Sequence, residues 1–97
     1  MRLSDNTILI TGGTSGIGLA LGKALLEMNN QVILLGRNKE KLAELEKAGF
    51  ETISCDLNKL SDIEEASVLI QNKYPQLNML FNSIMPGYSI ITILRRV

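Results

Sequence analysis

Short apolar runs alternate along this chain with longer segments in which apolar residues recur every three or four positions. Residues 7–11 (Thr-Ile-Leu-Ile-Thr) and residues 31–35 (Gln-Val-Ile-Leu-Leu) are short, nearly continuous apolar runs. Such runs are typical of strands that are buried on both faces of a parallel sheet. Weaker runs at 50–55 and 77–82 predict two further strands.

Three segments between these runs have the spacing of amphipathic helices. The second helix is expected to begin after Asn38, a good N-cap residue, and to end before Gly49, which suits a left-handed conformation. The third is expected to begin at a capping box, Ser61-x-x-Glu64. The predicted buried faces are Ile17, Leu21, Ala24, Leu25 and Met28 in the first helix, Leu42 and Leu45 in the second, and Ile63, Ala66 and Ile70 in the third.

Strands that alternate with helices of this length predict an α/β fold, built as a partial Rossmann fold with a doubly wound parallel sheet of strand order 3-2-1-4. Right-handed crossovers place the first two helices on one face and the third on the other. The fourth strand then lies at an open edge, which could promote self-association. The segment 83–97 departs from the alternation. We therefore expect a half-domain at 1–82 and a divergent tail at 83–97.

Composition narrows the class of protein. Ten Lys and Arg residues balance ten Asp and Glu residues, which argues against a nucleic-acid-binding surface. No apolar stretch approaches the roughly 20 residues of a membrane span. The chain has one cysteine, Cys55, and no histidine, which argues against zinc sites, disulfide scaffolds and histidine-dependent triads. We expect a cytoplasmic protein without a metal, in which Cys55 is an apolar filler.

A glycine-rich segment, Thr-Gly-Gly-Thr-Ser-Gly-Ile-Gly at 11–18, joins the first predicted strand to the first predicted helix. This context favours dinucleotide binding, because Gly12 permits a tight turn and Gly16 permits close approach of a pyrophosphate. Gly18 allows the helix to pack against the strand, and the hydroxyls of Thr14 and Ser15 add donors. The alternative is a flexible turn with accidental glycines.

The end of the second strand bears on the choice of cofactor. A site for NAD needs an acidic residue there to bind the ribose 2′-hydroxyl, whereas this chain has Gly36 followed by Arg37. Arg37 could pair with a 2′-phosphate, so NADP is favoured over NAD. The alternative is that Arg37 is a solvated loop residue.

The spacing Thr-Gly-x-x-x-Gly-Ile-Gly resembles the short-chain dehydrogenase/reductase family, and the resemblance extends from residue 1 to about residue 82, most closely to oxidoreductases of the D-alanyl-lipoteichoic-acid operon. It implies that Asp56 holds the adenine and that Asn82 begins the family's Asn-Asn-Ala-Gly segment. Alternatively, Asp56 is a helix cap and Asn82 a strand-end turn residue. The predicted cofactor-binding residues are Gly12, Thr14, Ser15, Gly16, Ile17, Gly18, Arg37, Asn38, Asp56, Leu57 and Asn82.

The resemblance also implies a hydride transfer between a nicotinamide and a carbonyl or alcohol carbon, with a Tyr-x-x-x-Lys pair as acid and base. Tyr74 and Tyr88 are followed four positions later by Asn78 and Thr92, so no catalytic residue is predicted here. We expect an NADP(H)-dependent oxidoreductase truncated before its catalytic residues and inactive alone. A frameshift after codon 82 would explain the tail. The alternatives are a free-standing dinucleotide-binding module and an interaction protein that adds a strand to a partner sheet.

Overall fold

A parallel sheet forms the centre of the molecule. The computed structural model describes residues 4–12 and 16–82, and within them lie four strands, β1 (Thr7–Thr11), β2 (Gln31–Gly36), β3 (Glu51–Ser54) and β4 (Met79–Asn82). Their order is β3-β2-β1-β4, and every pairing is parallel. The predicted α/β fold with strand order 3-2-1-4 is therefore confirmed. The predicted tail, 83–97, lies outside the described residues.

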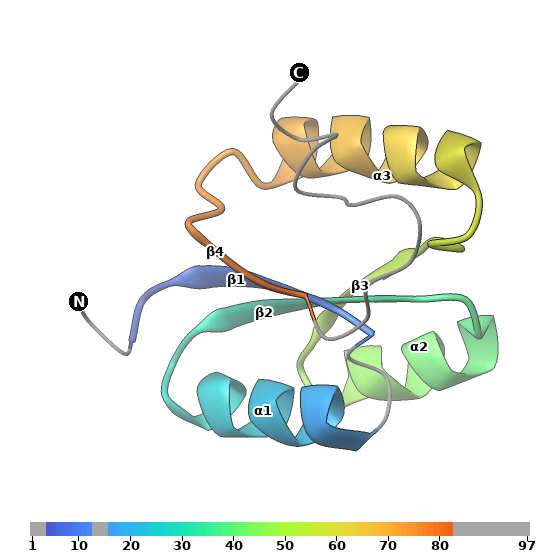
Figure 1. Ribbon diagram of the computed structural model, residues 1–97. Helices are drawn as coiled ribbons and strands as arrows, with labels where there is room; N and C mark the ends of the chain where they lie inside the picture. The colour runs from blue at the N-terminus through green and yellow to red at the C-terminus, as the bar shows by residue number, and fades with distance from the viewer. Residues whose placement is uncertain (1–3, 13–15, 83–97) are drawn as a thin grey trace.

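Helices cover the two faces of this sheet unequally. Figure 1 shows α1 (Gly16–Glu27) and α2 (Lys39–Lys47) on one face and α3 (Leu60–Lys73) on the other, as right-handed crossovers predict. Side chains of β1 alternate between the two layers, with Ile8 and Ile10 facing α1 and α2 and Leu9 facing α3. These three side chains are fully buried. The β1 strand therefore contributes buried side chains to the hydrophobic core on both faces of the sheet.

The predicted buried faces of α2 and α3 are confirmed, but that of α1 is wrong in part. Leu25 is buried and Leu21 is half-buried. Ile17 is 88% exposed and Met28 is 45% exposed, and Ala24 is exposed as well. The face of α1 that lies closest to the sheet carries two glycines in addition to Leu25, namely Gly18 and Gly22.

Gly22 explains why α1 turns this face inward. A Cβ atom at Gly22 would lie 3.3 Å from Phe50 Cε1, 3.4 Å from Ile10 Cδ1 and 3.5 Å from Leu34 Cδ2. The helix backbone therefore lies directly on the sheet's side chains. A count of large apolar residues misses such a face, because a glycine contributes close approach rather than apolar area.

The ends of α2 follow the sequence prediction. Asn38 is the N-cap, and its Oδ1 accepts hydrogen bonds from the N–H groups of Glu40 at 3.0 Å and Lys41 at 3.1 Å. Gly49 has φ +108° directly after the C-cap. The Phe50 N–H then donates to a carbonyl of the last helical turn, closing a Schellman motif.

The predicted capping box of α3 is wrong. The helix begins at Leu60, with Lys59 at the N-cap position, so Ser61 lies inside the first turn. The cause lies in the preceding turn. Oδ1 of Asp56 accepts the Asn58 N–H at 2.9 Å, and the Asp56 carbonyl accepts the Lys59 N–H at 3.0 Å. The chain is therefore already turning before it reaches Ser61.

Amide side chains join the strands at their amino ends. Oδ1 of Asn78 accepts the Thr7 N–H at 2.9 Å, and Nδ2 of Asn78 donates to Asn6 Oδ1 at 2.9 Å. Oδ1 of Asn30 accepts the Asn6 N–H at 3.0 Å, and its Nδ2 donates to the Leu25 carbonyl at 2.8 Å. These bonds fix the start of β4 and the end of α1 against β1.

Candidate functional site

The carboxyl ends of the strands lie level with one another. Thr11 pairs with Leu35 on one side and with Asn82 on the other, and Gly36 pairs with Ser54. In open parallel sheets, ligands bind outside this edge, where the strand order reverses. The predicted site residues in the described ranges come to this edge, with Gly12 after β1, Arg37 and Asn38 after β2, Asp56 and Leu57 after β3, and Asn82 at the end of β4.

The glycine-rich turn delivers the chain from β1 into α1. Gly12 has φ +68° and Gly16 has φ +60°, which are left-handed conformations that favour glycine. No atom lies within 4 Å of a Cβ built at Gly16, so the described residues leave open space beside this backbone. Thr14 and Ser15, which were expected to add hydroxyl donors, lie outside the described residues.

The amino end of α1 suits an anion. The first turn of α1 contains no acidic residue, so no side chain of that turn neutralises the positive end of the helix dipole. Ile17 is exposed in this turn, whereas Gly18 is buried against the sheet. The turn therefore combines backbone donors that have no acceptor within the helix with one accessible apolar side chain.

Arg37 and Asn38 follow β2 at the carboxyl edge of the sheet. Arg37 is exposed directly after Gly36. Oδ1 of Asn38 accepts the hydrogen bonds that cap α2, so this side chain acts as the N-cap of the helix. Arg37 therefore adds a positive charge at the edge of the sheet beside the glycine-rich turn.

The turn after β3 is held by two carboxylates. Asp56 accepts the Asn58 N–H through its side chain, but Lys59 occupies the N-cap position of α3, so the alternative interpretation of Asp56 as a helix cap is wrong. Its own N–H donates to Asp62 Oδ2 at 2.9 Å. Sequence reasoning missed Asp62, although an aspartate in the first turn of a helix is a recognisable signal. Leu57 is half-buried against the α3 layer of the core.

Cys55 lies directly before this turn, and it is an apolar filler as predicted. Its side chain is 2% exposed, and burial raises the pKa of the thiol from 9.0 to about 11, with the charges of Asp62 and Asp56 adding to the shift. A thiol with this pKa remains protonated at neutral pH, so Cys55 is a poor nucleophile.

Thr11 connects the two strands at the centre of the edge. Its hydroxyl donates to the Phe81 carbonyl at 3.4 Å, next to Asn82. This contact was not predicted, because it joins residues that are 70 positions apart. It holds the ends of β1 and β4 together at the point where the strand order reverses.

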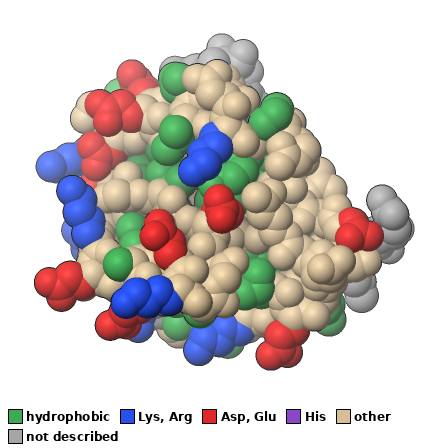
Figure 2. All heavy atoms as spheres, turned by 180° about the vertical axis from the view of Figure 1, so that it is seen from behind, with side chains coloured by type: hydrophobic (Ala, Val, Ile, Leu, Met, Phe, Trp, Pro, Cys, Tyr) green, Lys and Arg blue, Asp and Glu red, His purple; other side chains and the backbone are tan. Residues whose placement is uncertain are grey.

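Other classes of site find no support in the described ranges. No helix there is both long and apolar enough to span a membrane, and no group of three or more metal-ligating side chains occurs there. Figure 2 shows acidic and basic side chains interspersed over one face of the molecule. That face carries no extended patch of a single charge.

Comparison with known proteins agrees with this architecture. Residues 6–84 match the family model for short chain dehydrogenases. The chain is 42% identical over 85 residues to the oxidoreductase DltE of Bacillus subtilis, covering 86% of this chain and 34% of that protein. It is 35% identical over 86 residues to the short chain dehydrogenase/reductase dpfgG of Gibberella zeae, covering 84% of this chain and 32% of that protein. The chain thus spans about a third of the length of these relatives.

Solved structures show the same fold. A short chain dehydrogenase from Bacillus anthracis superposes with a TM-score of 0.74 at 26% identity, covering 86% of this chain and 36% of that one. A short-chain dehydrogenase from Streptomyces avermitilis has a TM-score of 0.73 at 29% identity, covering 79% of this chain and 30% of that one. With the glycine-rich turn at the carboxyl edge of a 3-2-1-4 sheet, these matches show that the chain belongs to the short-chain dehydrogenase/reductase family, of which it contains the N-terminal part.

Proposed function

We propose that this chain is the dinucleotide-binding part of an NADP(H)-dependent oxidoreductase that acts on a small carbonyl or alcohol. Family membership implies an NAD(P) cofactor. One observation carries the choice of NADP: at the end of β2, beside the glycine-rich turn, the chain has exposed Arg37 after Gly36, where an NAD site needs a carboxylate.

The residues at the carboxyl edge fit such a cofactor. The left-handed Gly12 and the open space beside Gly16 let a pyrophosphate approach the amino end of α1, whose N–H groups would bind it. Arg37 would pair with the 2′-phosphate through charge-assisted hydrogen bonds, which contribute about 1.5–3 kcal/mol. When bound, the nicotinamide supplies the hydride donor or acceptor.

The remaining predicted residues would position the other parts of the cofactor. The turn at Asp56 and Leu57, held by Asp62, would contact the adenine. Ile17 would offer an apolar contact above the turn, and Asn82 would lie beside the cofactor at the end of β4. Thr14, Ser15, Gly18 and Asn38 complete the proposed set, the last two by packing α1 and capping α2.

Calorimetric titration of the 97-residue chain with NADP and with NAD tests the cofactor proposal. We expect tighter binding of NADP, and we expect Arg37→Asp to reduce the preference by about tenfold or more, as loss of a charge-assisted pair requires. Lys23→Asp makes the same charge change on the exposed surface of α1 and should leave the preference unchanged. Equal affinities for the two cofactors, or an unchanged preference in Arg37→Asp, would refute the assignment.

We further propose that residues 1–82 form the binding half-domain, that 83–97 is a divergent tail, and that the 97-residue chain alone is inactive. The support is the sequence itself, in which no tyrosine is followed four positions later by a lysine. NADPH oxidation by the purified chain with a panel of aldehydes and ketones should equal the protein-free rate. A rate above that background would overturn this part of the proposal, while cofactor binding would stand.

A further inference from the structure

Strand β3 lies at the edge of the sheet opposite β4. Within the described part of the chain, β3 pairs with β2 alone. The Cys55 N–H donates to the Gly36 carbonyl at 2.8 Å, and along a strand successive backbone groups point to alternate sides. The N–H and C=O groups of Thr52 and Ser54 therefore point outward, away from β2.

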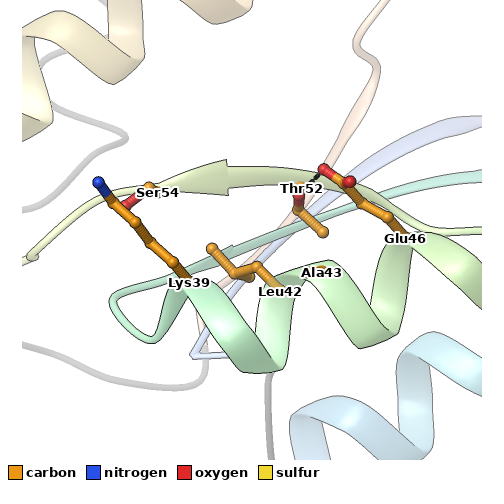
Figure 3. Close-up of a pocket in the computed structure, with 6 residues that line it drawn as sticks. All are labelled: Lys39, Leu42, Ala43, Glu46, Thr52 and Ser54. Carbon is orange, nitrogen blue, oxygen red and sulfur yellow. Dashed lines mark hydrogen bonds between the residues drawn. The ribbon is translucent and has the colours of Figure 1, made fainter.

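A groove runs beside this edge, between β3 and α2, with a volume of about 270 Å³. Figure 3 shows the Lys39 side chain extending toward Ser54 at one end of the groove. At the other end, the Thr52 hydroxyl donates to Glu46 Oε1 at 2.6 Å. The groove therefore has a positive end and a negative end. Between them lie Leu42 and Ala43.

This arrangement is complementary to itself. Lys39 and Glu46 are two helical turns apart on the same side of α2, and both are exposed. A two-fold axis perpendicular to the sheet, just outside β3 and level with the middle of the groove, would place Lys39 of each copy opposite Glu46 of the other. The same axis is level with Ile53 of both copies, so that Thr52 of each copy lies opposite Ser54 of the other.

The backbone register agrees with the charge pattern. Thr52 and Ser54 are the residues with outward backbone groups, and residues that face each other as a hydrogen-bonded antiparallel pair exchange two N–H···O=C bonds. Two such pairs would form across the axis. Glu51 would face Cys55 of the second copy, so no like charges oppose each other along the seam.

We propose that two copies of this chain associate through the outer edge of β3, with the α2 helices antiparallel on one side of the seam. The interface uses none of the proposed cofactor-binding residues, so the proposal does not depend on the cofactor assignment. The seam is short and its ion pairs are exposed, so we expect a weak dimer, with a dissociation constant on the order of 100 μM.

Sedimentation velocity over a range of concentrations tests this proposal on the 97-residue chain. Thr52→Pro removes an outward N–H that the β2 ladder does not use, and it should weaken dimerisation by about tenfold or more. Thr52→Val keeps that N–H and the β-branched shape, and it should change dimerisation by less than about threefold. Binding of NADP should be the same in both variants.

A charge exchange provides an independent test. Lys39→Glu and Glu46→Lys should each weaken dimerisation several-fold, and the double variant should restore it, because each pair is then reversed but still opposite in sign. The single changes place an acid at the start of α2 and a base at its end, which favours the helix. If circular dichroism shows that Thr52→Pro does not fold, the charge-exchange variants alone test the dimer proposal.

Four results would overturn the proposal. They are a wild-type chain that remains monomeric up to about ten times the expected dissociation constant, a dimer that Thr52→Pro leaves intact, a double charge variant no better than the single ones, and a dimer abolished by Phe81→Pro. The last change blocks the outer side of β4, so its effect would assign self-association to the opposite edge instead.

Discussion

Replacing Asn78 by alanine tests how β4 is held against β1. The Asn78 side chain accepts the Thr7 N–H at 2.9 Å and donates to Asn6 Oδ1 at 2.9 Å. The backbone bond from the Asn78 N–H to the Thr7 carbonyl, at 3.1 Å, survives the substitution. Thr7 is only 7% exposed, so its N–H would lose its acceptor with little access to water.

The contacts of Asn78, with typical hydrogen-bond energies, give the expected loss of stability. Loss of the acceptor leaves the buried Thr7 donor unsatisfied, which costs about 2 kcal/mol, and the exposed bond to Asn6 contributes about 0.5 kcal/mol. We therefore expect Asn78→Ala to lower the free energy of unfolding by about 2.5 kcal/mol. In a domain of this size each kcal/mol shifts the Tm by about 4–8 °C, which gives a decrease of about 10–20 °C.

Urea unfolding and thermal melting, both followed by circular dichroism, measure this change. Asn78→Asp keeps the acceptor for Thr7 but loses the donor to Asn6, so its effect should be less than about half as large. Asn72→Ala, on the exposed side of α3, should stay within about 0.5 kcal/mol of the wild type. A free energy of unfolding for Asn78→Ala within about 0.5 kcal/mol of the wild type would show that the side chain does not hold β4.

Two further predictions concern the core. The folded state keeps the Cys55 thiol protonated up to a pKa of about 11, so unfolding releases its proton above pH 9. Cys55 should therefore lower the free energy of unfolding by about 2 kcal/mol between pH 9 and pH 11. Cys55→Ala in a Tyr74→Phe background should flatten this fall, since burial and the bond to Glu51 raise the pKa of Tyr74 as well; an unchanged slope contradicts the assignment. Gly22→Leu should lower the free energy of unfolding by about 2 kcal/mol or more in urea titration, whereas Gly22→Ala should change it by less than about 1 kcal/mol, and equal effects would show that α1 is not in close contact with the sheet.

The sequence was sufficient for the sheet, and particular residues show why. Ile8 to Ile10 and Val32 to Leu35 are buried on both faces, so their side chains need no alternation and appear as continuous apolar runs. The handedness of crossovers then leaves one arrangement of the helices. The carboxyl-edge positions of Gly12 and Arg37 follow from the same reasoning, because each comes directly after a strand.

Features that depend on close approach or on distant partners were not predictable. The face of α1 that carries Gly22 has little apolar area, so a hydropathy pattern favours Ile17 and Met28 instead. Asn78 was not distinguished in the sequence, because its partner Thr7 lies 71 residues away. The start of α3 was predicted wrongly because Ser61 has the spacing of a capping box, although the helix begins earlier. The turn at Asp56 that starts the helix leaves no such spacing in the sequence.

The position of β4 beside β1 has a consequence for the order of folding. The contact between Thr7 and Gln31 closes a loop of 24 residues, whereas that between Thr7 and Asn78 closes one of 71. The longer closure costs about 1 kcal/mol more in chain entropy, and it must wait until nearly the whole described chain has been synthesised. We infer that β1, α1 and β2 assemble first and that β4 docks last. A nascent chain therefore exposes one side of its central strand until the Asn78 region leaves the ribosome, and the β1–β4 seam is the step at which misassembly competes with folding.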